Sequence, residues 1–356
     1  MLSSSTFRAL VSGQACGLLA TIARFGLSLA EIPYRWAVAY RNHRFDKGLR
    51  TVHDVGVPVI SVGNLTLGGT GKTPTVELLA TYFLENGVRI AIVSRGYGSS
   101  SREHNDEAME LSEKLPQVPH VQNPDRVAAA TSAIEQHACQ AILLDDGFQH
   151  RRLARDLDIV LIDALEPFGF NHVFPRGTLR EPVSNIVRAD AVALTRCELI
   201  DHEQREDIRQ RIDSLAPNAV WLEITHHVES LLGADGRSDD PKSLDGEQIA
   251  AFCGIGNPQN FRRTIDSSCN WDLAGWREFP DHHRYDRQDV ANLLDWLKTI
   301  RANVAVCTHK DLVKLRSIWP TDMKLYALTI TSKILKGGDD LNCLLKPLIK
   351  RAATNS

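Results

Sequence analysis

One run of the chain combines glycines, a lysine and a threonine in the order that phosphate binding requires. The run is G-N-L-T-L-G-G-T-G-K-T-P at residues 63–74; it follows the β-rich segment Val59 to Val62 and precedes a helical pattern. Backbone N–H groups of such a turn surround phosphate oxygens, and the next helix adds its positive dipole end. The predicted phosphate loop and helix start contain Gly68, Gly69, Thr70, Gly71, Lys72 and Thr73.

Two side chains of this run have the most specific chemistry. Lys72 is expected to reach the β- and γ-phosphates of a nucleotide, and the Thr73 hydroxyl is expected to bind Mg²⁺. The usual pattern places its first glycine at residue 66, where this chain has Thr66. The order of strand, turn, Gly-Lys-Thr and helix favours a phosphate loop despite that departure. The alternative is a flexible glycine-rich turn with a solvated lysine.

A second apolar run ends in two carboxylates. Residues 141–144 are Ala-Ile-Leu-Leu, and Asp145 and Asp146 follow directly. The carboxyl end of a parallel strand lies at the ligand-binding edge of such sheets, and carboxylate oxygens suit Mg²⁺. Adjacent extended residues point to opposite faces, so one aspartate is expected to hold the metal and the other a lysine or a water. The alternative for Asp146 is a turn residue that stabilises Asp-Gly.

Three further segments carry chemistry that spacing alone leaves open. A carboxylate at Asp106 could orient or deprotonate a hydroxyl beside a γ-phosphate, or it could be a solvated loop residue. Arg180 could stabilise a transferring phosphoryl group, or it could belong to an Arg-Glu surface pair. Asp281-His282-His283 suggests acid–base work or a polar cap, because no further ligands stand at zinc spacing.

Composition limits the function classes. The chain has 356 residues and a net charge of −3, so no global positive field attracts nucleic acid. Its seven cysteines are scattered and form no C-x-x-C pair, which argues against a disulfide framework or a zinc site.

Short β-rich runs alternate with helical patterns along most of the chain, which predicts a mostly parallel sheet flanked by helices. We expect a P-loop core over residues 51–225 and a smaller C-terminal α/β lobe over residues 226–356 that closes over a cleft. The predicted strands are 59–62, 89–94, 141–145, 159–163, 191–195, 220–224, 249–253, 304–308 and 325–330.

Residues 1–50 are expected to form an amphipathic helix followed by a basic segment. Leu18, Ile22, Phe25 and Leu29 stand at helical spacing, and aromatic and basic residues follow between Tyr34 and Arg50. Arg24 interrupts the apolar run, which makes a membrane-spanning helix a poor interpretation. An apolar helix face with basic neighbours favours an anionic membrane surface as partner, and the alternative is a helix packed on the domain.

Taken together, these segments resemble the tetraacyldisaccharide 4'-kinase family, from about Tyr34 to Lys314. A missing first glycine in the phosphate loop is typical of that family. The matching motifs are the run at 63–74, S-R-G-Y-G (94–98), N-D-E-A (105–108), D-D-G-F-Q-H (145–150), L-R-E-P (179–182), G-I-G-N-P (254–258), F-P-D-H-H-R-Y (279–285) and T-H-K-D (308–311).

The resemblance implies an enzyme that uses ATP and Mg²⁺ to phosphorylate the 4'-hydroxyl of an acylated glucosamine disaccharide 1-phosphate, forming lipid IVA in lipid A biosynthesis. It implies a peripheral position on the cytoplasmic face of the bacterial inner membrane. It also implies a catalytic set of Asp106, His282, Lys72 and Arg180 and a metal site of Thr73, Asp145 and Asp146. The alternatives are a nucleotide-dependent switch without a phosphate acceptor and a soluble small-molecule kinase.

Overall fold

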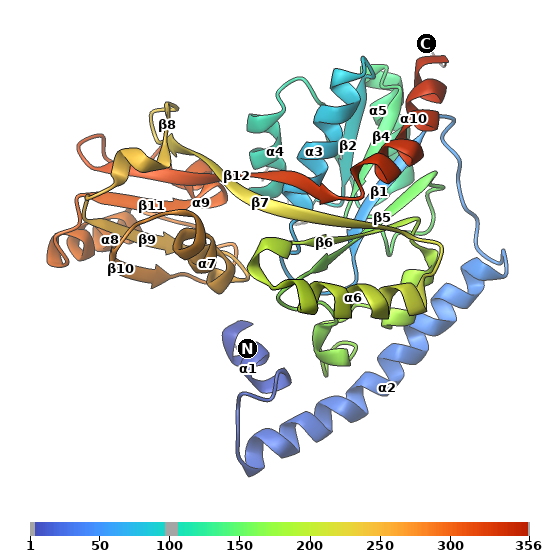
Figure 1. The fold of residues 1–356 in the computed structure, drawn as a ribbon, viewed down its shortest axis with the longest axis horizontal. Coiled ribbons are helices and arrows are strands. Elements are labelled where there is room, and N and C mark those ends of the chain that lie inside the picture. The colour runs from blue at the N-terminus through green and yellow to red at the C-terminus, as the bar shows by residue number, and fades with distance from the viewer. Residues whose placement is uncertain (1–3, 97–105, 355–356) are drawn as a thin grey trace. The chain divides into compact units, whose positions relative to one another are not determined.

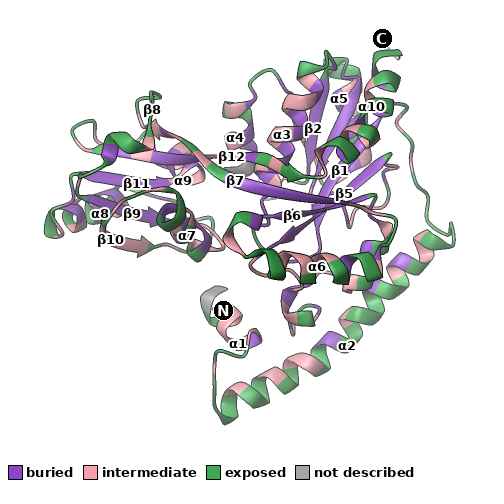
Figure 2. Ribbon diagram, in the orientation of Figure 1, coloured by how far each residue is buried: buried purple, intermediate pink, exposed green. Residues whose placement is uncertain are grey.

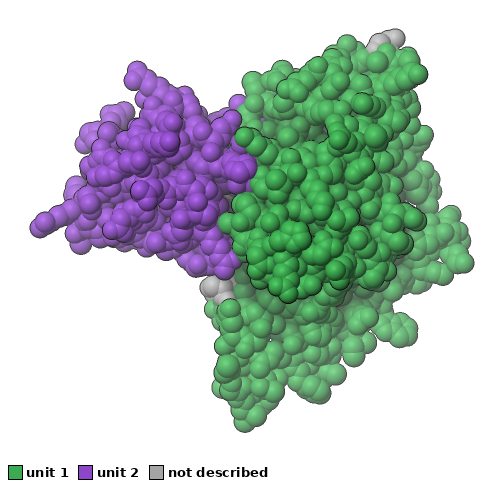
Figure 3. Space-filling view, viewed as in Figure 1, with its two compact units in different colours: residues 1–103, 114–225, 332–356 green, residues 104–113, 226–331 purple. Residues whose placement is uncertain are grey.

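The computed structural model describes residues 4–96 and 106–354 and divides the chain into two compact units. Unit 1 comprises residues 1–103, 114–225 and 332–356, and unit 2 comprises residues 104–113 and 226–331 (Figure 3).

This division departs from the predicted boundaries of 1–50, 51–225 and 226–356 in two places. Residues 104–113 cluster with unit 2, and residues 332–356 cluster with unit 1. The second difference arises because β12 (Lys324–Lys336) leaves unit 2 before α10 (Gly338–Thr354) begins. In unit 1, the Arg351 Nη2 atom of α10 lies 2.6 Å from Asp156 Oδ2. The C-terminal segment therefore completes the core that begins hundreds of residues earlier in the chain.

Unit 1 contains a parallel sheet with the strand order β7-β6-β5-β1-β4-β2-β3 (Figure 1). In β1, Val62 pairs in register with Asp145 of β4, so the predicted phosphate loop and the paired aspartates follow neighbouring strands. The strands are β1 (Val59–Asn64), β2 (Ile90–Ser94), β3 (His120–Gln122), β4 (Ala141–Asp145), β5 (Leu157–Asp163), β6 (Ala191–Thr195) and β7 (Val220–Gly233).

Helices and short 3-10 turns flank this sheet, as the alternating pattern predicts. The helices with described residues in this part of the chain are α1 (Ser4–Val11), α2 (Leu18–Asp46), α3 (Lys72–Glu85), α5 (Arg126–His137), α6 (His202–Leu215) and α10. The 3-10 turns are η1 (Gly169–Asn171), η2 (Val183–Arg188) and η3 (Cys197–Leu199).

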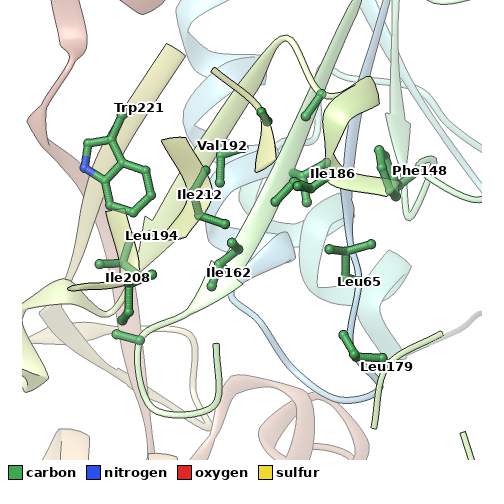
Figure 4. Close-up of a cluster of buried hydrophobic side chains, with 14 of the residues drawn as sticks. Leu65, Phe148, Ile162, Leu179, Ile186, Val192, Leu194, Ile208, Ile212 and Trp221 are labelled. Atoms are coloured by element: carbon green, nitrogen blue, oxygen red, sulfur yellow. The ribbon is translucent and has the colours of Figure 1, made fainter. Parts of the chain in front are cut away.

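Alternate residues of the unit 1 strands pack in buried clusters. Ile208 and Ile212 of α6 join Ile162, Val192 and Leu194 in one buried cluster (Figure 4). Alanines of α5 pack in another buried cluster with β1, β2 and β4. Strands buried on both faces are continuous apolar runs, which is why the sequence located most of them.

Unit 2 has the strand order β10-β9-β11-β12-β7, and β8 forms an antiparallel hairpin pairing with β7. The stretch from Gly233 to Gly246 contains β8. Residues 106–113 of α4 (Asp106–Lys114) belong to unit 2. The other elements of unit 2 that have not yet been given are β8 (Ser238–Asp239), η4 (Pro241–Leu244), β9 (Ile249–Cys253), α7 (Pro258–Ser268), β10 (Leu273–Glu278), α8 (Arg287–Thr299), β11 (Val304–Thr308) and α9 (His309–Leu315).

Helix α2 is the long N-terminal helix that the sequence predicts, and one of its faces packs against the rest of unit 1. Glu31, Val38 and Asn42 are buried on that face, while most other positions of the helix are exposed (Figure 2). The Glu31 carboxylate accepts a 2.8 Å hydrogen bond from the backbone N–H of Val173. Within residues 4–96 and 106–354, no helix combines the length and apolar character needed to cross a bilayer.

Gly63 of β1 is required by close packing against Phe148. A Cβ atom at residue 63 would lie 2.6 Å from both the Cβ and the backbone N of Phe148, which is fully buried. We predict that Gly63→Ala lowers the free energy of unfolding by about 1–3 kcal/mol, because the backbone after Asp146 must shift. Urea unfolding measures this change. Gly69→Ala is the control, since a Cβ there meets nothing within 4 Å; equal stability of the two variants would contradict the prediction.

Candidate active site

The phosphate loop spans residues 65–71, between the end of β1 and the start of α3. Gly68 and Gly71 adopt positive φ angles of 112° and 80°, a conformation that favours glycine. The Thr75 hydroxyl donates a 2.9 Å hydrogen bond to the Gly71 carbonyl and closes the first turn of α3. Lys72 and Thr73 therefore stand at the helix N-terminus, as predicted for a lysine and a threonine that face phosphates.

The structure explains why Thr66 can replace the usual first glycine. Thr66 forms an antiparallel bridge with Leu179, so its backbone is extended and needs no positive φ. The bridge continues on both sides: Leu67 N–H donates to Thr178 O at 2.7 Å, and Arg180 N–H donates to Leu65 O at 2.7 Å. The same pairing holds the L-R-E-P motif beside the phosphate loop.

Lys72, Asp146 and Arg180 form one charge cluster at the end of β4. Arg180 Nη1 lies 2.8 Å from both carboxylate oxygens of Asp146, and Lys72 Nζ lies 3.6 Å from Asp146 Oδ1. Burial would raise the pKa of Asp146, but the charges of Lys72 and Arg180 outweigh burial and lower it. In this geometry Asp146 is the aspartate of the pair that contacts a lysine. Arg180 pairs with the same aspartate and not with a surface glutamate.

Two residues that the sequence analysis missed hold the other side of the loop. The Thr195 hydroxyl donates a 2.9 Å hydrogen bond to Thr70 O, and Arg196 Nη2 donates a 3.0 Å bond to Gly69 O. Arg196 is itself fixed by Asp163, whose Oδ2 lies 2.6 Å from Arg196 Nη1. Asp163 and Thr195 end β5 and β6. A polar residue at the carboxyl end of a parallel strand was the signal that would have found them.

Glu181 is a buried carboxylate that ties several segments to the site. It accepts a 2.9 Å hydrogen bond from Gln149 Nε2 and a 3.0 Å bond from Asn42 Nδ2 of α2. Arg188 Nη2 lies 3.0 Å from the same carboxylate, so its charge is compensated. Gln149 also donates to Asn64 O at 2.9 Å. The end of α2 is thus joined to the D-D-G-F-Q-H motif through Glu181, and Gln149 of that motif extends the link to β1.

The two adjacent histidines of unit 2 have different surroundings. His283 Nε2 lies 2.8 Å from Asp289 Oδ2, and its ring packs 4.8 Å from the Phe279 ring. The His282 side chain is 58% exposed, and its Nε2 atom lies 3.8 Å from Asp281 Oδ1. The backbone of His282 has a positive φ of 56°. This geometry presents His282 to solvent and makes His283 part of the local packing. Asp106 is the first residue of α4, and its side chain lies outside the described part of the structure.

Asp311 brings three of the sequence motifs together. It accepts hydrogen bonds from Thr308 Oγ1 at 2.6 Å, Gly254 N at 3.1 Å and Tyr285 OH at 3.1 Å. Burial raises its pKa even though these hydrogen bonds oppose the shift. The G-I-G-N-P, F-P-D-H-H-R-Y and T-H-K-D motifs therefore meet at one buried carboxylate, and that contact fixes the segment that carries His282.

Comparisons with known proteins give the family of this chain. Residues 23–349 match the tetraacyldisaccharide-1-P 4'-kinase family, LpxK. This chain belongs to that family. The tetraacyldisaccharide 4'-kinase of Anaeromyxobacter sp. (strain Fw109-5) is 37% identical over 88% of this chain and 89% of its own length. The kinase of Syntrophus aciditrophicus is 36% identical over 81% and 83% of the two chains.

A solved structure of the family has the same fold. The crystal structure of LpxK from Aquifex aeolicus in complex with ATP has a TM-score of 0.73 to this kinase. The two proteins are 28% identical, and the match covers 92% of this chain and 99% of the other. The predicted fold class, the kinase activity and the use of ATP are thereby confirmed. The family match begins within α2, so α1 precedes it.

The donor set of this kinase fits Mg²⁺. Thr73 and Asp145 are buried near the phosphate loop and supply hard oxygen donors, which Mg²⁺ prefers. Within the described ranges, no three His, Cys, Asp or Glu side chains form a closed metal site. Mg²⁺ is usually held by one or two carboxylates together with substrate phosphates and water, so a small protein donor set suits it. Thr73, Asp145 and Asp146 remain the predicted metal residues.

Proposed function

We propose that this kinase transfers the γ-phosphate of ATP to the 4'-hydroxyl of a tetraacylated glucosamine disaccharide 1-phosphate. The observation that carries the proposal is the charge cluster at the start of α3, where Lys72 and Arg180 share Asp146. Such a cluster neutralises charge that develops on a transferred phosphoryl group. The relatives that cover most of this chain carry the name of a kinase for that lipid.

The loop and its braces have the positioning role in this proposal. Backbone N–H groups of residues 68–71 would surround the phosphates, and the bonds from Thr195 and Arg196 would keep the loop in that shape. Thr73 and Asp145 would hold Mg²⁺, with Asp146 beside them. When bound, the ion would neutralise phosphate charge and orient the chain of phosphates.

Proton transfer is assigned to the motifs of unit 2. In the proposed step, the 4'-hydroxyl oxygen forms a bond to the γ-phosphorus as the bond to the β,γ-bridging oxygen breaks, and ADP leaves. The hydroxyl proton passes to Asp106, and His282 assists that carboxylate. The exposed position of the His282 ring supports this role, in contrast to the packed ring of His283.

The exposed face of α2 supports peripheral binding to the cytoplasmic face of the inner membrane. Its outer side carries a continuous stripe of large apolar residues at helical spacing, opposite the face that contacts unit 1. Arg35, Lys47 and Arg50 are exposed near its C-terminal half, where anionic lipid would attract them. The stripe comprises Leu18, Leu19, Ile22, Phe25, Leu29, Ile32, Trp36 and Tyr40.

We predict that Phe25→Asp with Leu29→Asp reduces binding to anionic vesicles at least about tenfold. The two side chains lie in the middle of the stripe. Each substitution removes apolar area and adds a negative charge that an anionic membrane repels. Sedimentation with phosphatidylglycerol vesicles measures the effect. Leu335→Asp is the matched control, because Leu335 is similarly exposed but lies in β12. Equal vesicle binding by both variants would exclude α2 as the membrane contact.

The assay that tests the function follows the label of γ-labelled ATP with tetraacyldisaccharide 1-phosphate in detergent micelles. A labelled lipid product supports the proposal. Release of labelled inorganic phosphate without labelled lipid would instead favour the nucleotide-dependent switch. Full lipid activity and unchanged solubility after removal of residues 1–33 would favour a kinase that needs no membrane contact.

A further inference from the structure

Helix α1 lies before the region that matches the family, yet it packs against the rest of unit 1. Val11 is buried, and its carbonyl accepts a 3.1 Å hydrogen bond from Arg176 Nη1. The rings of Phe7 and Phe174 lie 6.3 Å apart. Arg24 of α2 donates a 2.8 Å hydrogen bond to Ala15 O, just after the helix. These contacts hold α1 in a defined position, so its side chains have fixed neighbours.

Arg8 of α1 reaches the phosphate loop. Its Nη2 atom lies 2.8 Å from the position that a Cβ on Gly68 would occupy, so the guanidinium is in contact with the outer turn of the loop. Its Nη1 atom lies 2.6 Å from Glu166 Oε2, and the arginine side chain remains 25% exposed. Glu166 Oε1 also accepts a 2.5 Å hydrogen bond from Thr178, the residue whose carbonyl accepts from Leu67.

Three arginines surround the loop, and each is paired with a carboxylate: Arg180 with Asp146, Arg196 with Asp163 and Arg8 with Glu166. Arg8 differs in that it comes from α1 and lies against Gly68, where a glycine leaves the guanidinium close to the loop backbone. A guanidinium presents several N–H donors in a plane that fits two phosphate oxygens. Burial raises the pKa of the Glu166 carboxyl group, and the charge of Arg8 opposes that shift.

We propose that Arg8 is a phosphate-binding residue of the nucleotide site, supplied by a helix outside the family match. When ATP occupies the loop, the guanidinium leaves Glu166 and pairs with the phosphates. The inference rests on the proposed function only in placing the ATP phosphates at residues 68–73. It adds a contact that the matched region of the family does not contain, and it makes nucleotide affinity depend on the seating of α1.

The test measures equilibrium binding of a non-hydrolysable ATP analogue with Mg²⁺ and without lipid, using isothermal titration of the full chain. Arg8→Ala is expected to weaken binding about five- to tenfold, because a charged contact with phosphate is lost. The loss is moderate because the variant has no ion pair with Glu166 that nucleotide binding must break. Arg8→Lys keeps the charge but lacks the planar guanidinium. Its affinity for the analogue is expected to lie between those of the native chain and Arg8→Ala. A thermal unfolding curve for each variant checks that unit 1 is folded.

Glu166→Gln separates a phosphate contact from a bracing role. If Arg8 contacts phosphate, this substitution frees the guanidinium, and binding stays equal or becomes tighter. If Arg8 acts only by holding Glu166 and Thr178, Glu166→Gln weakens binding as much as Arg8→Ala does, and the proposal is overturned. Unchanged or tighter binding by Arg8→Ala also overturns it. Lys72→Ala is measured beside them: its failure to weaken binding would instead reject the phosphate loop itself.

Discussion

Replacement of Lys72 by alanine is expected to reduce the rate of phosphoryl transfer to lipid by about 10²–10³-fold. Removing one preorganised group that stabilises transition-state charge has an effect of this size. Lys72 is the first residue of α3, and its ammonium lies 3.6 Å from Asp146. The substitution therefore removes a cation from the phosphates and leaves the pair between Asp146 and Arg180 in place. Labelled lipid formed per minute, at saturating ATP and lipid in micelles, measures the loss.

Lys114→Ala is the matched control for that experiment. Lys114 also forms an ion pair, with its Nζ 2.7 Å from Glu77 Oε2, and its side chain is as little exposed as that of Lys72. It stands at the end of α4, and no phosphate contact is predicted for it. A rate for Lys72→Ala within a factor of three of the control rate would rule out the proposed role of the loop lysine.

Asp106→Asn is expected to reduce turnover by about 10²–10⁴-fold, because a positioned general base contributes that range. The substitution keeps the size of the side chain and removes its ability to take the hydroxyl proton. Affinity for the non-hydrolysable ATP analogue should stay unchanged, since the predicted role of Asp106 concerns the acceptor hydroxyl. Single-turnover measurement of labelled lipid separates this chemical step from product release.

The neighbouring histidines supply a further comparison for the proton-transfer step. His282→Ala should lower the single-turnover rate without changing thermal stability, because the His282 ring is largely exposed. His283→Ala should lower stability, because that ring pairs with Asp289 and packs on Phe279.

A turnover rate for Asp106→Asn above a tenth of the native rate would mean that another group removes the proton.

Local patterns were sufficient to predict most strands of the sheet. Strands such as β4 and β6 are apolar on both faces, so their positions are legible without knowledge of their partners. The short β3 and the polar α4 were missed, since three residues or a mostly charged helix give little periodic signal. The predicted C-terminal lobe differs from unit 2 after residue 331, because chain order does not reveal that α10 returns to the first unit.

The sequence by itself determined the phosphate loop, the paired aspartates after β4 and membership of a kinase family, because these features depend on residues that are close together in the chain. Only the tertiary structure decided which side chains support them. Arg196 reaches Gly69 across 127 positions, and Arg8 pairs with Glu166 across 158. Such contacts depend on which strand ends and helices the fold brings together. A local pattern of residue types does not predict a contact between residues so far apart in the sequence.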